Sequence, residues 1–367
     1  MRLLLVTNDY PPRLGGIQKY LADLVEHFPG PVRVLAPGRE AVPADPLVVR
    51  AGPSYLWPTT ATRRWVLRQI GEFGPRVVLF GAPHPLAVLG PGLLAETGIP
   101  YGVIAYGADL LVPSAVPVAR SLVARPLRRA SVVFALSRFI LGAAERISGR
   151  SVDYLGCGID SEKFHPPNGR LDGPPGGERG SKVIGSVGRF VPRKGQDRLL
   201  RAVAELRRSG LQVEVLLVGG GRMEGRLRKL AGKLKVPVRF EVKVPWDRLP
   251  SLYRQMDVFA LPVRSRWFGL EAEGLGIVYL EAAASGLPVV AGASGGAPET
   301  VVPGVTGFVA HGPAHLAEAL EMLLRNPEGA HRMGEEGRNQ AEAQFSWEAV
   351  MERLQAGLEL AVRRVAE

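Results

Sequence analysis

The sequence predicts an α/β fold built from two doubly wound parallel-sheet domains, and three observations lead to it. Strand-like apolar runs alternate with amphipathic helical patterns along almost the whole chain, as in βαβ units. The alternation breaks near residue 166 at the Pro/Gly-rich segment PPNGRLDGPPGGERG and then restarts. With 367 residues the chain is also too long for one ordinary core. We therefore expect two α/β domains of similar size with a cleft between them.

The first domain is expected to span residues 1–166. Its strand-like runs are RLLLVT, VRVLAP, RVVLFGA, YGVIAYG and VVFALS, and GIQKYLADLVEHF after the first of them predicts a helix. Such short, continuous apolar runs are typical of parallel strands that are buried on both faces.

A linker over residues 167–181 is expected to lead into a second domain over residues 182–345. Its strands are predicted in KVIGSVGRF, VEVLLVGGG, VRFEVKV, DVFALPV and LPVVAG, and its first helix in GQDRLLRAVAELRRSG. A last helix over residues 346–367 has Ser346 as its N-cap and carries an apolar stripe. We expect this helix to pack back toward the first domain.

Composition narrows the function classes. Cys157 is the only cysteine, which excludes an intramolecular disulfide and a cysteine metal cluster and favours the cytoplasm. We expect neither a secretory signal nor a membrane span, because the most apolar candidate, VVFALSRFILGAA, is interrupted by Arg138. The net charge of +11 indicates an anionic partner. Nucleic acid is not expected, since no nucleic-acid-binding module is recognisable.

Three glycine-containing turns follow predicted strands, where open α/β sheets bind ligands. In NDYPPRLGGIQ, Gly15 and Gly16 precede a helix and either receive an anion or form a tight turn. In VGRFVPRKGQD, Arg189 and Lys194 suit two neighbouring phosphoryl groups, although a solvated basic loop has the same composition. The cluster VGGGRMEG is weak evidence, because such turns are common.

The stretch EGLGIVYLE places Glu273 in a turn and Glu281 one turn inside a helix expected to begin near Ile277. The amides of residues 274–276 would lie at the positive end of that helix, where they fit a diphosphate or sugar oxygens. A carboxylate is also a natural acceptor for sugar diols. Equally, Glu273 could cap the helix and Glu281 could be a buried carboxylate paired within the protein. The residues alone leave both interpretations open.

Together these motifs resemble the retaining GT-B glycosyltransferases of family four. The resemblance is carried by E-x7-E after an aromatic/Gly loop, GR…RKG upstream, SGGAPETVVPGVTGF downstream, the N-terminal GG turn, and CGID…F.P before the linker. GLEAEGLGIVYLEAAASGLPVVAG is most similar to bacterial GDP-mannose-dependent α-mannosyltransferases that build phosphatidylinositol mannosides. The family resemblance implies two Rossmann-like domains facing a cleft. The acceptor would bind to the N-terminal domain and the nucleotide sugar to the C-terminal one.

The resemblance also implies roles for individual residues. Glu273 would bind the transferred sugar, Glu281 the ribose diol, and Arg189 and Lys194 the diphosphate. The remaining donor contacts would come from Gly16, Val242, Lys243, Gly274, Leu275, Gly276 and Ile277. The acceptor would contact Asp9, Gly15, Gln18, Arg63 and Arg64.

Two positions depart from the family pattern. Tyr106, in AYGADL, stands where the family has a histidine facing the reacting sugar, and a phenol hydrogen-bonds without carrying positive charge. Val242 stands where the family has a glycine before the base-reading position, which leaves guanine and uracil both open. His84 is expected to be an ordinary loop histidine.

No cofactor or metal is expected, because the chain has no D-x-D pair and no metal-ligand spacing. Family members are thought to transfer on one face of the sugar, with a leaving phosphate oxygen accepting the proton of the acceptor hydroxyl.

The predicted function is transfer of a hexose, mannose from GDP-mannose, to an inositol-lipid acceptor. An alternative keeps the family but has a UDP- or other nucleotide-sugar donor and a soluble sugar or polyol phosphate acceptor. A nucleotide-sugar epimerase or a non-catalytic binder is less favoured, because Arg189, Lys194, Glu273 and Glu281 are all intact.

Two segments mix arginine with apolar residues, as an interfacial helix on anionic lipid would. For TTATRRWVLRQI we favour a helix whose apolar face is simply core, and for VPVARSLVARPLRRA both interpretations stay open. Peripheral contact with the inner face of the cell membrane is therefore a hypothesis.

Overall fold

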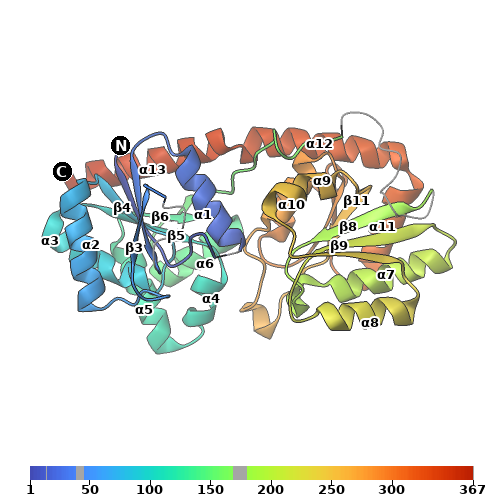
Figure 1. Cartoon of the computed structure of the whole chain (residues 1–367), viewed down its shortest axis with the longest axis horizontal. Helices are drawn as coiled ribbons and strands as arrows, with labels where there is room; N and C mark the ends of the chain where they lie inside the picture. Colours follow the sequence, from blue (N-terminus) through green and yellow to red (C-terminus); the bar gives the residue numbers. More distant parts are fainter. Residues whose placement is uncertain (14, 39–44, 168–179, 367) are drawn as a thin grey trace. The chain divides into compact units, whose positions relative to one another are not determined.

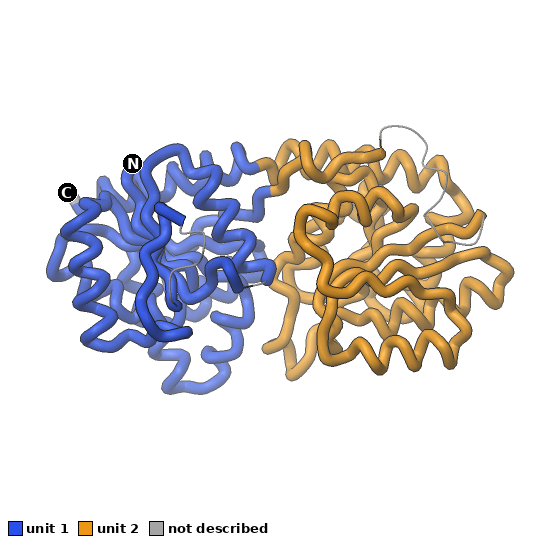
Figure 2. The backbone as a smooth tube through the Cα atoms, viewed as in Figure 1, with its two compact units in different colours: residues 1–158, 347–367 blue, residues 159–346 orange. Residues whose placement is uncertain are grey.

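A computed structural model describes residues 1–13, 15–38, 45–167 and 180–366. The chain divides into two compact units, residues 1–158 with 347–367, and residues 159–346 (Figure 2). Each unit contains one parallel sheet, so the predicted α/β class with two parallel sheets is confirmed. The linker expected over residues 167–181 lies largely outside the described residues, and the domain bounds stay a prediction.

The first unit is built on a seven-stranded sheet with the order β3-β2-β1-β4-β5-β6-β7 (Figure 1). All four residues of β1 are buried, as expected for a strand covered on both faces. The strands are β1 (Leu3–Val6), β2 (Val32–Pro37), β3 (Val48–Ala51), β4 (Val77–Phe80), β5 (Tyr101–Ala105), β6 (Val132–Ala135) and β7 (Asp153–Tyr154).

The helices of this unit connect successive strands, and the last one comes from the C-terminal end of the chain. They are α1 (Gly16–His27), α2 (Thr60–Phe73), η1 (Leu86–Leu89), α3 (Gly90–Thr97), α4 (Ala108–Ser114), α5 (Pro117–Arg129), α6 (Arg138–Ser148) and α13 (Trp347–Ala366). α13 packs on α1, β5 and β6. At its first residue, the Trp347 ring stacks on His27 and Tyr20, with centroids 4.8 and 5.7 Å away.

The second unit is built on a six-stranded sheet with the order β10-β9-β8-β11-β12-β13. The strands are β8 (Lys182–Val187), β9 (Val213–Gly219), β10 (Val238–Val242), β11 (Val258–Leu261), β12 (Val289–Gly292) and β13 (Gly307–Ala310). The helices are η2 (Pro192–Lys194), α7 (Gln196–Arg208), α8 (Glu224–Leu234), η3 (Trp246–Arg248), α9 (Leu249–Tyr253), η4 (Trp267–Gly269), α10 (Ile277–Ala284), η5 (Ala297–Thr300), α11 (Pro313–Arg325) and α12 (Pro327–Phe345).

The strand order of the second sheet brings two distant segments together. After β8 the chain continues to β9 on one side, whereas β11 pairs with β8 on the other side. The connections that follow β8 and β11 therefore leave the same edge of the sheet as neighbours, at the point where a doubly wound sheet binds ligands. These connections carry Arg189 to Lys194 and Glu273 to Gly276, respectively.

Candidate functional site

The centre of the candidate site is a buried carboxylate held by two cations. Glu273 lies in the connection from β11 to α10, and Lys194 ends the η2 turn after β8. The Lys194 Nζ is 2.9 Å from Glu273 Oε2, and the Arg193 guanidinium donates to the same oxygen. Glu273 and Lys194 are both buried, so solvent screens this ion pair weakly. Both cations make their shortest contact with the same oxygen, Oε2.

The charges of this cluster are set by the balance of burial and pairing. Burial raises the pKa of Glu273, but the charges of Lys194 and Arg193 outweigh it, and the net pKa lies below the usual value. Burial also lowers the pKa of Lys194, which the Glu273 charge opposes. The carboxylate is thus kept ionised inside the protein.

Close backbone packing fixes the carboxylate in place. Gly295 has φ +59°, and a Cβ there would lie 1.9 Å from the Glu273 carbonyl oxygen. The Gly296 N–H donates to the same carbonyl at 3.0 Å. On the other side, a Cβ at Gly195 would lie 2.1 Å from the Pro262 carbonyl oxygen, at the start of the connection that carries Glu273.

The N-terminus of α10 adjoins Glu273, as predicted. α10 begins at Ile277, and Gly276 precedes it in a left-handed conformation with φ 94°. Gly274 and Leu275 complete the turn, and Leu275 is buried. The positive end of the helix dipole therefore lies beside the carboxylate, where amides could bind oxygens of a sugar or phosphate.

Glu281 occupies a second buried position on the same helix. The Tyr253 hydroxyl donates to Glu281 Oε2 at 2.6 Å, and the Tyr253 ring packs edge-on against Phe164 with centroids 5.6 Å apart. Phe164 belongs to the CGID…F.P motif, so that motif supports the tyrosine that orients Glu281.

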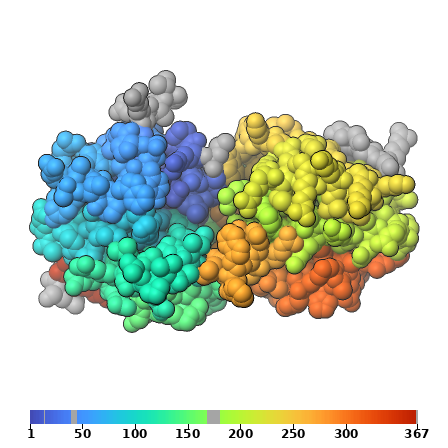
Figure 3. Space-filling view, turned by 90° about the horizontal axis from the view of Figure 1, so that it is seen from below, coloured from blue at the N-terminus to red at the C-terminus, as the bar shows by residue number. Residues whose placement is uncertain are grey.

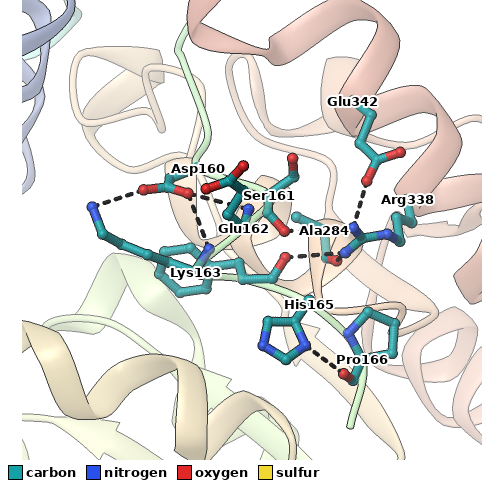
Figure 4. A network of polar contacts seen from close by, with 10 residues as sticks. Asp160, Ser161, Glu162, Lys163, His165, Pro166, Ala284, Arg338 and Glu342 are labelled. Carbon is teal, nitrogen blue, oxygen red and sulfur yellow. Dashed lines mark hydrogen bonds and ion pairs between the residues drawn. The ribbon is translucent and has the colours of Figure 1, made fainter. Parts of the chain in front are cut away.

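The same motif also anchors the C-terminal end of α10 (Figure 4). The Arg338 guanidinium donates to the carbonyl oxygens of Ala284, at 2.6 Å, and Phe164, at 3.2 Å, and pairs with Glu342 at 2.5 Å. Nearby, Lys163 pairs with Asp160 at 2.7 Å, and the Asp160 carboxylate accepts the Lys163 N–H at 3.0 Å. Residues 160–164 thus hold the helix that carries Glu281.

Arg189 lies near Lys194, and its role at the diphosphate stays a prediction, whereas the sequence analysis did not single out Arg193. Arg189 is exposed, forms no ion pair in the described part of the chain, and its charge lowers the pKa of Lys194. Arg193 precedes Lys194 directly in VPRKGQD, and its neighbourhood is so rich in basic residues that it did not stand out. The direct pairing of Lys194 with Glu273 was not predicted either.

Val242 and Lys243 follow at the end of β10. Val242 pairs in register with Gly219, so both residues reach the edge where the Gly219–Gly221 turn leaves β9. Lys243 is exposed and has φ 56°, a left-handed conformation. These positions agree with a ligand edge, and their role in reading a base stays a prediction.

In the first unit, the predicted acceptor residues form only one direct pair. The Gln18 amide donates to Asp9 Oδ1 at 2.6 Å, next to Gly15 and the α1 N-terminus at Gly16. Burial raises the pKa of Asp9, and Arg13 and Gln18 partly oppose this.

On α2, Arg63 forms an ion pair with Glu96 of α3, while the neighbouring Arg64 is exposed. His84 lies in the loop after β4, and burial lowers its pKa. A part in acceptor binding stays a prediction for these arginines.

Tyr106 directly follows β5 and is buried in the first unit. Its hydroxyl is buried and has no hydrogen-bond partner among the described residues, and the Tyr20 ring packs edge-on at 6.0 Å. Three residues on, the Asp109 carboxylate accepts the Gly107 N–H at 2.7 Å, and desolvation by the surrounding protein raises its pKa to about 6. Sequence reasoning missed Asp109, although it lies in the same AYGADL motif.

Two further properties concern the described residues as a whole. No group of three or more His, Cys, Asp and Glu side chains among them could hold a metal ion. None of their helices combines the length and apolarity needed to span a bilayer.

Comparison with known proteins gives a consistent result. Residues 174–340 match the family model described as "Glycosyl transferases group 1". The chain is 40% identical over 365 residues, 94% of its length and 95% of the relative, to a GDP-mannose-dependent alpha-(1-6)-phosphatidylinositol monomannoside mannosyltransferase of Mycolicibacterium smegmatis. It is 35% identical, over 96% of both chains, to a GDP-mannose-dependent monoacylated alpha-(1-6)-phosphatidylinositol monomannoside mannosyltransferase of Corynebacterium glutamicum.

Among solved structures, sucrose-phosphate synthase from Thermosynechococcus elongatus has a TM-score of 0.80 at 23% identity, with complete coverage of both chains. Anabaena HepE in complex with UDP has a TM-score of 0.79 at 20% identity, covering 98% of this chain and 100% of HepE. At these identities the structural likeness establishes a shared fold.

Proposed function

Because this chain belongs to the group 1 glycosyltransferases, we propose that it transfers mannose from GDP-mannose to a phosphatidylinositol mannoside, with retention of configuration. The family resemblance and the GT-B fold that the sequence predicted are confirmed. The donor and acceptor are carried over from the printed names of full-length relatives.

The observation that carries the proposal is the Glu273 cluster. One oxygen of a buried, ionised carboxylate is engaged by Arg193 and Lys194. Glu281 lies about one helical turn further on α10, oriented by Tyr253. Two carboxylates, one just before α10 and one inside it, with cations and helix amides near the first, suit a donor that has a sugar at each end of a diphosphate.

In the proposed reaction, the bond between the sugar anomeric carbon and the diphosphate oxygen breaks as the acceptor oxygen bonds to the same carbon on the same face. The acceptor hydroxyl gives its proton to the departing phosphate oxygen, which leaves as GDP. Negative charge grows on the diphosphate as the bond breaks, so Arg189, Lys194 and the α10 amides stabilise the transition state more than the bound donor. Glu273 orients the sugar, and Arg193 orients Glu273.

The test is calorimetric titration of GDP, UDP and ADP into protein purified with a chelator, followed by their sugar conjugates. We expect selective GDP binding, and we expect Glu281→Ala to weaken it, because ribose contacts contribute to binding and change little during reaction. Selective UDP or ADP binding would replace the donor assignment. A lack of binding to any of the three nucleotides would contradict the proposed function itself.

We also propose peripheral contact with the inner face of the cell membrane, through the first unit. α2 buries its apolar residues Val66 and Ile70, as favoured above, and so offers no obvious lipid surface. In contrast, the start of α5 exposes Val116, Val118 and Leu122, and Val118 is 75% exposed. No acidic residue occurs between Asp109 and Glu145, a stretch with five arginines, so this surface suits anionic lipid.

Sedimentation with vesicles checks this contact. The protein should sediment with phosphatidylglycerol vesicles at low salt and should remain in the supernatant with phosphatidylcholine alone. Val118→Asp should lower the bound fraction, and Val305→Asp, at an exposed valine of the second unit, should not. Equal binding of all three proteins would assign the contact to another surface.

A further inference from the structure

The connection from β11 to α10 carries two exposed aromatic residues at its tip. Trp267 is 60% exposed and Phe268 is completely exposed, in a chain that has only 7% aromatic residues. Figure 1 shows this connection, with its short η4 turn, extending beyond the edge of the second sheet, and its orange atoms lie at the surface in Figure 3. Large exposed aromatics on a defined turn are typical of contact sites.

The backbone of the tip is strained. Trp267 has φ 49° and Phe268 φ 54°, so two adjacent residues with bulky side chains adopt the left-handed conformation. Each such residue is less stable there than in a right-handed conformation, because its Cβ crowds the following carbonyl oxygen. Strain of this kind persists only where the surrounding structure imposes it, and it is concentrated at binding sites.

The base of the tip imposes that conformation through several contacts. Arg266 pairs with Glu271 at 2.9 Å, and their backbones exchange hydrogen bonds at 3.0 and 3.2 Å. The Arg266 guanidinium also lies over the Trp267 ring, 5.0 Å from its centroid. Further from the tip, Arg264 pairs with Asp197 at 3.1 Å, and its N–H donates to the Arg193 carbonyl oxygen at 2.8 Å. The tip is thus presented on a fixed support.

The chemistry of the tip favours an apolar ligand. Arg264 and Arg266, the two cations nearest along the chain, are each paired with a carboxylate, which leaves the tip without excess charge. An anionic headgroup would gain little there, whereas indole and phenyl rings suit the boundary between an aliphatic chain and its polar head. The tip is also continuous with the site, since Glu273 follows Glu271 by two residues.

We propose that Trp267 and Phe268 contact the glycerol and acyl-chain end of a lipid-linked acceptor, while Glu273 holds the sugar of the donor. This inference rests on the proposed function, because it takes from there an acceptor that has both a sugar head and acyl chains. On this proposal, the second unit, which is proposed to bind the donor, also contributes to acceptor specificity.

The test compares two acceptors with one variant. Initial rates are measured with phosphatidylinositol monomannoside in detergent micelles and with its deacylated, water-soluble form. For Trp267→Ala/Phe268→Ala we expect KM for the acylated acceptor to rise on the order of tenfold or more, since two large apolar side chains lose their contact. KM for the deacylated acceptor and the affinity for GDP should change less than about twofold, which is below ~0.4 kcal/mol.

Trp246→Ala is the matched control, because Trp246 is an exposed tryptophan of the same unit, on η3. It should leave both acceptors unaffected. An equal loss with both acceptors in the double variant, with GDP affinity kept, would place the aromatics on the sugar head and overturn the inference. A loss of GDP affinity would assign the tip a structural role and overturn it as well.

A second readout is independent of transfer. Phosphatidylinositol with brominated acyl chains, in micelles, quenches tryptophan emission on contact. We expect quenching in the wild type and in Trp246→Phe, and a marked decrease in Trp267→Phe. Equal quenching in all three proteins would contradict the inference, even if the wild type transferred mannose to neither acceptor and the proposed function had failed.

Discussion

Glu273 in the second unit and Asp109 in the first are both carboxyl groups surrounded by protein, yet their pKa values are shifted in opposite directions. Lys194 and Arg193 overcome the burial of Glu273 and keep its pKa below the usual value. Among the described residues, the carboxylate of Asp109 accepts from the backbone N–H groups of Gly107, Tyr106 and Asp109 itself, and burial raises its pKa to about 6. The comparison shows that neighbouring cations, and not burial alone, decide in which direction the pKa of a buried carboxyl shifts.

The difference separates the two units chemically. The site of the second unit holds fixed charges, which suits an anionic donor whose diphosphate gains charge during reaction. In the first unit, the Tyr106 hydroxyl is buried without a hydrogen-bond partner among the described residues, and burial raises the pKa of the neighbouring Asp109 to about 6. Tyr106 carries no positive charge, unlike the histidine of the family pattern when that residue is protonated.

The largest expected effect comes from removing a cation of the charged site. Lys194→Ala should lower kcat on the order of 10²-fold or more, because it withdraws stabilisation of the leaving diphosphate and leaves Glu273 with one cation. Arg189→Ala should lower kcat comparably. Steady-state kinetics with GDP-mannose measure both. Near-normal kcat in the two variants would contradict the assignment of these residues to the diphosphate.

An intermediate effect is expected from Arg193. Arg193→Met should lower kcat/KM on the order of tenfold, and its acid limb should move to higher pH. The reason is that Arg193 helps to keep the pKa of Glu273 low, so without it the carboxylate takes up a proton at a higher pH. Lys194 and the Tyr279 hydroxyl remain near Glu273, and Arg189 remains near Lys194.

Two variants sharpen that pH test. Arg193→Lys should restore much of the acid limb, because it returns the charge. Arg264→Met removes a nearby arginine that pairs with Asp197 instead of Glu273, and its profile should follow the wild type. A profile that is the same in Arg193→Met and wild type would show that Lys194 alone holds the carboxylate.

The smallest effect on transfer is expected from Asp109 of the first unit. Asp109→Asn keeps an acceptor for the Gly107 N–H and should change kcat less than about threefold at pH 7.5, since it leaves the charged site intact. The substitution should instead change how the free energy of unfolding depends on pH. Because the folded pKa of Asp109 lies above its ordinary 3.8, the wild type loses stability as the pH rises from about 4 through about 6. Asp109→Asn should lack this loss, which denaturant unfolding at several pH values would detect.

The Glu273 site was easier to predict from sequence than the surroundings of Tyr106 and Asp109, for a physical reason. Arg189, Lys194, Glu273 and Glu281 follow strands or begin helices, and in a parallel sheet such positions converge on one edge whatever the details of packing. Alternating apolar runs predicted both sheets on the same basis. The roles of these residues stay predictions, but the motifs already indicate that the residues lie at the same edge of the sheet.

What escaped prediction depends on side-chain packing. Nothing in VPRKGQD distinguishes Arg193, which turns toward Glu273, from the many exposed arginines around it. The buried state of the Tyr106 hydroxyl depends on Tyr20 of α1, more than eighty residues earlier in the chain. The left-handed tip at Trp267 and Phe268 was likewise invisible, because strain has no composition signal.

The return of α13 to the first unit has a practical consequence for dissecting the protein. The second unit, residues 159–346, is one uninterrupted stretch of the chain, so both of its ends can be set by simple truncation. The first unit cannot be obtained by a simple truncation, since ending the chain before Trp347 would remove the stacking partner of Tyr20 and His27. A separate first unit would need residues 347–366 rejoined through a designed connection. A frameshift near the end of the gene would therefore remove part of the unit that contains the N-terminus.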